Sequence, residues 1–199
     1  MRREATKTGW EPIGAGDSDV RTCGPFSELA RWDEVSTGVQ DAIEKAARGG
    51  SCWPLVLIGP AGSGKTCAAV ASVMRWGGKF WQLNEFCDLL IDAAQDRLYH
   101  NSCGVGYKIT ARAIWDEWRT AKLAVIDDVG TRTKVSDHQF DTLKRLLDSR
   151  ELRPTIVTTN LQIDGIASVF DDRVASRLAG GTVIQFDGDR RLGRETCTH

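Results

Sequence analysis

The sequence predicts an α/β fold in which helices sandwich a five-stranded, mostly parallel sheet. Short runs of mostly apolar or β-branched residues, the first of them continuously apolar, alternate five times with stretches whose apolar residues recur at helical spacing. Strands that are apolar at every position are typical of parallel sheets, because helices cover both faces of such sheets. With 199 residues, of which 41% are hydrophobic and 27% charged, the chain has the length and composition of roughly one globular domain.

Each element is assigned from its residue pattern. Strands are expected where mostly apolar or β-branched residues follow one another, at 54–58, 79–83, 123–126, 155–159 and 182–186. Helices are expected where apolar residues recur every three or four positions, at 36–48, 67–74, 84–93, 110–120, 140–147, 163–169 and 171–179. Asn84 is expected to cap the third helix, and Gly49 to end the first. Residues 99–109 are expected to form a loop.

The composition limits the domain organisation and the kinds of function. Residues 1–35 are expected to be an arm or linker, 36–191 the core and 192–199 a tail. The net charge of -1 excludes a uniformly basic, histone-like chain. No apolar run is long enough to span a bilayer, and no hydrophobic segment follows the N-terminal positive charges, so neither a membrane protein nor a secretory signal is expected. The six cysteines form no Cys-x-x-Cys pair, which favours reduced cysteines in a cytosolic compartment over a zinc site.

A glycine-rich loop between the first strand and the second helix carries the strongest functional signal. Residues 59–66 fit the pattern Gly-x(4)-Gly-Lys-[Ser/Thr], in which backbone N–H groups close on phosphate oxygens. Lys65 is expected to reach the β- and γ-phosphates of ATP, and Thr66 to bind Mg²⁺. The alternative is a fortuitous glycine turn. The residues expected to bind the nucleotide are Gly59, Pro60, Ala61, Gly62, Ser63, Gly64, Lys65, Thr66 and Cys67.

Polar residues that follow two later strands are expected to complete this site. Asp127 and Asp128 come directly after the apolar run 123–126. Asp127 is expected to hold Mg²⁺, and Asp128 to orient or deprotonate the attacking water. Asn160 follows strand 155–159, and it can reach the γ-phosphate or the water if these two strands are neighbours. The alternatives are a plain turn residue for Asp128 and a helix cap or turn for Asn160.

Two arginines lie on the last expected helix. Arg173 and Arg177 are four residues apart, so they share one helical face. Their spacing leaves two interpretations open. The helix is either a salt-bridged surface helix or a helix that presents a cation to the nucleotide of a neighbouring subunit.

Four ordered motifs carry a resemblance to a known family: the phosphate loop 59–66 and residues 126–130, 158–161 and 172–178. With the short ending at 180–187 and 190–191, they make residues 36–191 resemble the AAA+ ATPases of the DnaC/DnaI helicase-loader group and the related IstB-type transposition ATPases. The resemblance implies a P-loop AAA+ core whose strands lie in the order 5-1-4-3-2. It also implies an arginine finger supplied in trans, which corresponds to Arg177, with Arg173 as a second candidate.

The chain departs from the family pattern at two places. Many AAA+ proteins carry Asp-Glu where this chain has Asp127-Asp128, and the shorter side chain is expected to slow hydrolysis. No full helical lid domain fits after Phe186, so a lid arginine is absent or is replaced by Arg190 or Arg191.

The segment 97–122 combines cations with aromatic side chains, a combination that suits single-stranded nucleic acid. The cations are Arg97, Lys108, Arg112, Arg119 and Lys122, and the aromatic residues are Tyr99, His100, Tyr107, Trp115 and Trp118. In the resembled family this segment faces DNA, so single-stranded DNA is expected to bind here. The alternative is that the tryptophans pack in the core and that the charges are solvated.

The function expected from these features is that of a Mg-ATP-dependent AAA+ ATPase. It is expected to hydrolyse ATP at the interfaces of a homo-oligomer and to act in DNA replication on a replicative helicase, as DnaC-like loaders do. The alternatives are an IstB-like helper of a transposase acting on duplex DNA, a small P-loop kinase, and a binding module that holds ATP as a structural switch.

Overall fold

The computed structural model describes residues 30–49, 53–97, 99–102, 105–130 and 135–188. Most of the expected arm, the tail at 192–199, and both Arg190 and Arg191 lie outside the described residues, so these expectations stay predictions. Within the described ranges, no helix combines the length and the apolar character that crossing a membrane requires.

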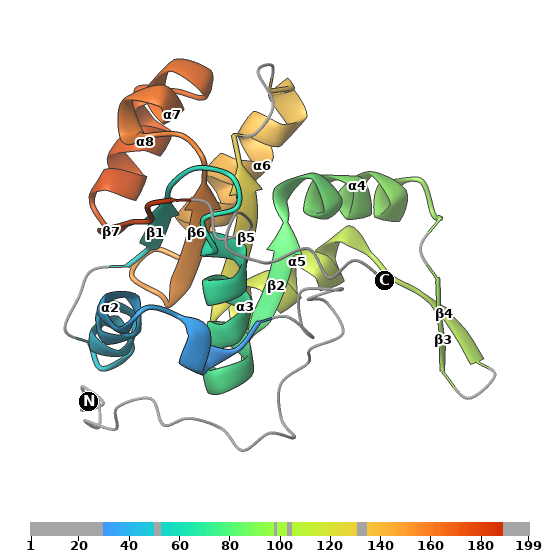
Figure 1. The fold of residues 1–199 in the computed structure, drawn as a ribbon. Coiled ribbons are helices and arrows are strands. Elements are labelled where there is room, and N and C mark those ends of the chain that lie inside the picture. Colours follow the sequence, from blue (N-terminus) through green and yellow to red (C-terminus); the bar gives the residue numbers. More distant parts are fainter. Residues whose placement is uncertain (1–29, 50–52, 98, 103–104, 131–134, 189–199) are drawn as a thin grey trace, which may run out of the picture.

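Five parallel strands form the central sheet (Figure 1). They are, in chain order, β1 (Leu55–Ile58), β2 (Lys79–Gln82), β5 (Ala124–Val129), β6 (Thr155–Thr159) and β7 (Thr182–Gln185). Their order across the sheet is β2-β5-β6-β1-β7, and every neighbouring pair is parallel. This is the predicted order 5-1-4-3-2 viewed from the opposite edge, so the predicted fold class is confirmed.

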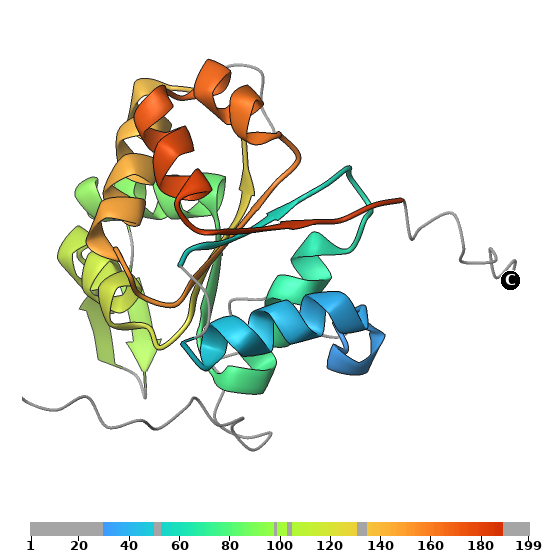
Figure 2. The same ribbon diagram turned by 90° about the vertical axis from the view of Figure 1, so that its left-hand side faces the viewer.

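Helices cover both faces of the sheet. The helices are α2 (Thr37–Ala47), α3 (Lys65–Trp76), α4 (Leu83–Ala94), α5 (Ala111–Thr120), α6 (Asp137–Ser149), α7 (Ile163–Val169) and α8 (Asp172–Ala179). Figure 2 shows α2 and α3 on one side of the sheet and the later helices on the other. A short 3-10 helix, η2 (Trp32–Glu34), precedes α2, and the nearby Ala30 and Val35 are buried against α2 and α3.

Two hydrophobic clusters explain why the strands are apolar at successive positions. In β1, Leu55 and Leu57 belong to the cluster under α2 and α3, whereas Val56 and Ile58 belong to the cluster under the other helices. All four side chains are fully buried. The alternation of side chains in a strand therefore supplies one apolar residue to each layer in turn.

Two local predictions are wrong. Residues 99–109 contain a hairpin, β3 (Tyr99–Ser102) and β4 (Val105–Lys108), which projects from the core beyond α4 (Figure 1). Its strands pair through their backbones, and they lack the run of mostly apolar or β-branched residues by which the other strands were predicted. Asn84 is not a helix cap, because Gln82 precedes the first helical residue and Asn84 lies inside α4.

A buried arginine ties the ends of two helices together at the amino edge of the sheet. Arg150, which follows α6, is 3% exposed. Its guanidinium donates to Thr155 Oγ1 (3.1 Å) and to the carbonyl oxygens of Trp118 (2.8 Å), Ala121 (2.9 Å) and Pro154 (2.6 Å). Burial lowers the pKa of Arg150 to about 10, so the group still carries its charge at neutral pH. The carbonyls of Trp118 and Ala121, at the end of α5, are satisfied in this way.

Replacing Arg150 with methionine is expected to lower the free energy of unfolding by about 3 kcal/mol, because several carbonyl oxygens lose their donor inside the protein. The measurement is chemical denaturation of the purified variant. Arg153→Met is the matched control, since exposed Arg153 donates to a single carbonyl, that of Arg119, at 2.7 Å. Equal stability of the two variants would show that the Arg150 contacts contribute little.

Candidate active site

The glycine-rich loop lies where β1 ends and α3 begins, at the carboxyl edge of the sheet (Figure 1). Gly59 packs so closely against the end of β7 that a Cβ added to it would lie 2.3 Å from the Phe186 carbonyl oxygen. Gly62 and Gly64 have left-handed backbones, with φ of 80° and 96°. Glycine alone meets both conditions without strain, so these residues allow the turn that leads into the positive end of α3.

Lys65, the first residue of α3, lies inside the loop that it follows. Its side chain is buried, and Nζ donates to the carbonyl oxygens of Gly59 (2.7 Å) and Pro60 (2.8 Å) and to Ser63 Oγ (3.3 Å). A buried ammonium group that is held by backbone oxygens gives the loop a fixed positive charge. Phosphate oxygens are the ligands that such a charge and the start of a helix favour together.

Asp127 brings two strands and one helix together beside this loop. Its carboxylate is 3% exposed and accepts hydrogen bonds from Thr66 Oγ1 on α3 (3.0 Å) and from Thr158 Oγ1 on β6 (2.5 Å). Burial raises the pKa of Asp127, and the charge of Asp128 raises it further, whereas the two hydroxyl donors and the charge of Lys65 lower it. The balance leaves a carboxylate whose charge is incompletely compensated.

The donor set at Asp127 fits a magnesium ion. A carboxylate and a hydroxyl oxygen already lie 3.0 Å apart at Thr66 and Asp127, and Mg²⁺ prefers oxygen ligands of these kinds. A cation at this position would also compensate the buried charge that raises the pKa of Asp127. Thr66 and Asp127 are therefore the residues that would hold the ion.

Asp128 is exposed, whereas the neighbouring Asp127 is buried. The strand β5 extends through both aspartates to Val129, further than expected from the apolar run, and its pairing with β6 is irregular between Ile126 and Val129. At this bulge Asp128 has a φ of 65°, and its N–H donates to Thr158 Oγ1 (3.0 Å). A left-handed backbone is unusual for an aspartate, and such conformations are found at functional sites. The exposed Asp128 carboxylate is thus separated from the buried one by the strained turn.

Asn160 lies at the same edge, between the phosphate loop and the two aspartates. Strand β6 separates β1 from β5, and Thr159 pairs with both Ile58 and Val129. Gly59 donates its N–H to the Thr159 carbonyl (3.3 Å), so exposed Asn160 directly follows the residue that is bonded to the loop. The condition that the sequence analysis set for Asn160, that the two strands be neighbours, is met.

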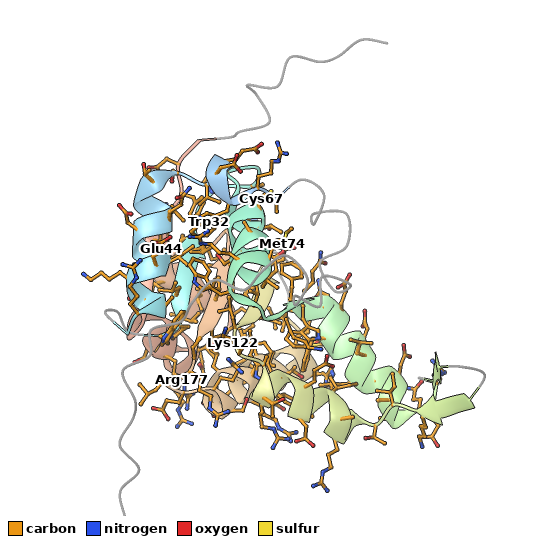
Figure 3. All side chains as sticks on the ribbon, turned by 90° about the horizontal axis from the view of Figure 1, so that it is seen from below. Trp32, Glu44, Cys67, Met74, Lys122 and Arg177 are labelled. Atoms are coloured by element: carbon orange, nitrogen blue, oxygen red, sulfur yellow. The ribbon has the colours of Figure 1, made fainter. Side chains whose placement is uncertain are left out.

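Arg177 lies far from the phosphate loop of its own chain. It is in the last turn of α8, which leads to Thr182, and Thr182 pairs with Leu55 at the start of β1. The phosphate loop follows the other end of β1, about 10 Å further along the sheet. Figure 3 places Arg177 and Cys67, which is next to the loop, on opposite sides of the sheet.

The two candidate finger arginines differ in their surroundings. Arg177 Nη2 forms an ion pair with Asp148 Oδ1 on α6 (2.6 Å). Arg173, one turn earlier on α8, is also exposed, and within the described ranges no ion pair is recorded for it. Asp171 caps α8, since its side chain accepts from the Val174 N–H (2.7 Å).

The structure differs most from the sequence-based expectation in the basic segment 97–122. Trp115 and Trp118 are 5% and 0% exposed and pack edge-to-face with Phe86, so neither can stack on a nucleic-acid base. The side chains of Tyr99, His100 and Tyr107 lie outside the described residues.

Four of the cations of this segment form ion pairs with acidic neighbours. The ion pairs join Arg97 to Asp92, Lys108 to Asp96, and both Arg112 and Arg119 to Asp116. Because exposed pairs of this kind are weak, a phosphate backbone can still compete for the cations, but the surface is less positive than the sequence suggests.

Sequence reasoning assigned no role to Thr158 or to Asp148. Thr158 bridges the two aspartates, since its hydroxyl donates to Asp127 and accepts from the Asp128 N–H. A threonine in a buried strand beside the expected metal-binding strand is the signal that points to it. Asp148 gives no such signal, because it contacts Arg177 on a helix that is separated from its own helix, along the sequence, by β6 and α7.

Together, β1, the loop, α3 and the carboxylate at the end of β5 define a nucleotide-binding fold of the phosphate-loop class. No protein-family model matches the sequence, and no curated protein matches it. Solved structures do. The chain is similar to the DnaC helicase loader, with 18% identity and a TM-score of 0.60 over 81% of this chain and 98% of that chain. It is similar to DnaI, with 18% identity and a TM-score of 0.61 over 81% and 93% of the two chains.

A replication initiator shares the same fold. AMPPCP-bound DnaA from Aquifex aeolicus is 18% identical, with a TM-score of 0.59, over 78% of this chain and 47% of that chain. This chain therefore spans about half the length of that DnaA chain. At these identities the likeness establishes the fold, which is that of the AAA+ domains of DnaC, DnaI and DnaA. The fold implied by the sequence motifs is confirmed.

Proposed function

We propose that this protein is an ATPase that binds Mg-ATP at the loop 59–66 and hydrolyses it at the interface between two copies of the chain. The observation that carries the proposal is the contact between Thr66 and Asp127, 3.0 Å long, beside the buried ammonium of Lys65. It joins the two residue types that Mg²⁺ binding needs to the loop that phosphates need. The AMPPCP in the DnaA structure supports nucleotide binding by this fold.

The residues at the carboxyl edge divide the work. Lys65 and the loop N–H groups bind the phosphates, and Thr66 with Asp127 holds Mg²⁺, which neutralises phosphate charge when it is bound. Exposed Asp128 orients the attacking water and accepts its proton, and Asn160 positions the same water or the γ-phosphate. Buried Asp127 is assigned to the metal ion and not to proton transfer, and its Oδ1 accepts hydrogen bonds from the hydroxyls of Thr66 and Thr158.

Arg177 completes the site of a neighbouring subunit. The location of Arg177 at the amino edge, away from its own loop, supports action in trans. An arginine there stabilises the charge that develops on the transferred phosphoryl group. Arg173 remains the second candidate, because it shares the exposed face of α8.

The biological role that we propose is in DNA replication, on a replicative helicase, with single-stranded DNA bound through the 97–122 segment. The similarity to the DnaC helicase loader and to DnaI supports this role, and so does the single-stranded DNA bound to DnaA in a further similar structure. Stimulation of ATP hydrolysis by single-stranded but not duplex DNA would support it. Stimulation by duplex DNA alone, or phosphorylation of a small molecule, would favour a transposition helper or a kinase.

The two aspartates provide the test of the site. Asp128→Asn is expected to bind Mg-ATP normally and to lose turnover, whereas Asp127→Asn is expected to lose the Mg²⁺-dependent part of the binding energy. Because burial raises the pKa of Asp127, its ionised form costs folding free energy at neutral pH. Removing that charge should therefore leave the melting temperature of Asp127→Asn no lower than that of the wild type.

The measurements are nucleotide titrations with and without Mg²⁺, single-turnover hydrolysis and thermal melts of both variants. If Asp127→Asn and Asp128→Asn showed the same Mg²⁺ dependence and the same residual turnover, the assigned division of roles would be wrong.

A further inference from the structure

The ion pair between Arg177 and Asp148 has a geometry that leaves the arginine available. Arg177 Nη2 contacts Asp148 Oδ1 at 2.6 Å, and 41% of each side chain is exposed. A guanidinium has donors on three nitrogens, and this contact uses one of them. The remaining donors can bind an anion from another molecule while Asp148 stays in place.

The two residues are fixed by well-packed helices. Asp148 is in the last turn of α6, and the neighbouring Leu146 and Leu147 are buried. Arg177 is in the last turn of α8 between buried Ala175 and Leu178, and the two helices share one hydrophobic cluster. The backbone positions of both residues are therefore set by the core, and the direction of the Arg177 guanidinium depends on the rotamer of its long side chain.

We propose that Asp148 is a positioning residue for the arginine finger: it holds the Arg177 guanidinium in the orientation that reaches the phosphates bound by a second copy of the chain. The inference rests on the proposed function, because it requires Arg177 to act in trans. An unrestrained arginine samples many rotamers, and fixing one of them in the transition state costs entropy. A carboxylate on a rigid helix restricts the rotamers of the arginine before the subunits associate, so less entropy is lost in the transition state.

Other charged groups of α6 lie near Asp148. Arg145 stacks over the Trp115 ring, with its guanidinium carbon 4.2 Å from the ring centroid. Asp141, Lys144, Arg145 and Ser149 line a surface hollow together with Asp148. Asp141 is two helical turns before Asp148 and is also exposed, so it is the matched residue for a change that removes one carboxylate from the same helix face.

The test compares Asp148→Ala, Asp148→Asn and Asp141→Ala in steady-state ATP hydrolysis by the full chain. Asp148→Ala is expected to lower kcat about tenfold with an unchanged KM for ATP, because the ATP site of each subunit keeps all its residues. Asp148→Asn retains the Oδ1 acceptor and is expected to stay within about threefold of the wild type. Asp141→Ala should match the wild type.

A double-mutant cycle separates positioning from a general structural effect. In an Arg177→Ala background, Asp148→Ala is expected to cause no further loss, since the residue that it orients is gone. Wild-type or faster hydrolysis by Asp148→Ala, or an equal loss in the Arg177→Ala background, would overturn the proposal for Asp148. If Arg177→Ala itself hydrolysed ATP at the wild-type rate, Arg177 would not be a trans-acting finger, and the role proposed for Asp148 would also be wrong.

Discussion

Arg177→Ala should bind ATP as the wild type does and hydrolyse it roughly 10³–10⁵ times more slowly. The arginine is at the amino edge of its own sheet, so its removal leaves every residue of its own phosphate loop unchanged. In the proposed mechanism, the variant loses the cation that stabilises the charge on the phosphoryl group transferred in a neighbouring subunit. Equilibrium binding of a fluorescent ATP analogue and single-turnover hydrolysis measure the two effects separately.

Arg48→Ala is the control for loss of an exposed arginine, because Arg48 pairs with Glu44 on α2, in the opposite helical layer. It should hydrolyse ATP normally. If Arg173→Ala lost hydrolysis and Arg177→Ala did not, the finger would be Arg173, and the assignment of Arg177 would be wrong.

Lys65→Ala should weaken ATP binding by about 100-fold or more, because the charge-assisted bonds to the β- and γ-phosphates are lost. The binding of the labelled analogue measures this directly. The Lys65 ammonium also holds three oxygens of the loop, so a melting curve must show that the variant is folded. Lys45→Ala, which removes an exposed lysine of α2, serves as the control and should bind ATP normally. Unchanged binding by folded Lys65→Ala would remove the phosphate-loop assignment.

The sheet and the phosphate loop could be predicted because both depend on local patterns. Strand β1 is apolar at all four positions because both faces are covered, and a reader of the sequence sees this run directly. The loop that follows it is short, and Gly59, Gly62 and Gly64 stand where tight packing or a positive φ requires glycine. Strand order followed from the family resemblance, and the position of Asn160 then followed from the strand order.

The rest depended on contacts between distant segments. The hairpin at β3 and β4 is stabilised by pairing between two short strands without an apolar run, so periodicity does not reveal it. From its residue type, Trp118 could stack on a nucleic-acid base. In the structure it is fully buried, and its Nε1 donates to the Leu146 carbonyl on α6 (3.2 Å). The pairing of Asp148 with Arg177 and the buried contacts of Arg150 are likewise set by how helices pack, which single-sequence patterns do not encode.

Mixing two inactive variants tests whether each active site is built from two subunits. Lys65→Ala keeps Arg177 but is expected to bind ATP too weakly to hydrolyse it, and Arg177→Ala is expected to bind ATP but to lack the finger. In an equal mixture, roughly a quarter of the head-to-tail interfaces combine an intact loop with an intact finger. The mixture is expected to recover ATP hydrolysis to a comparable fraction of the wild-type rate. A mixture as inactive as its components, under conditions in which the subunits demonstrably associate, would contradict it.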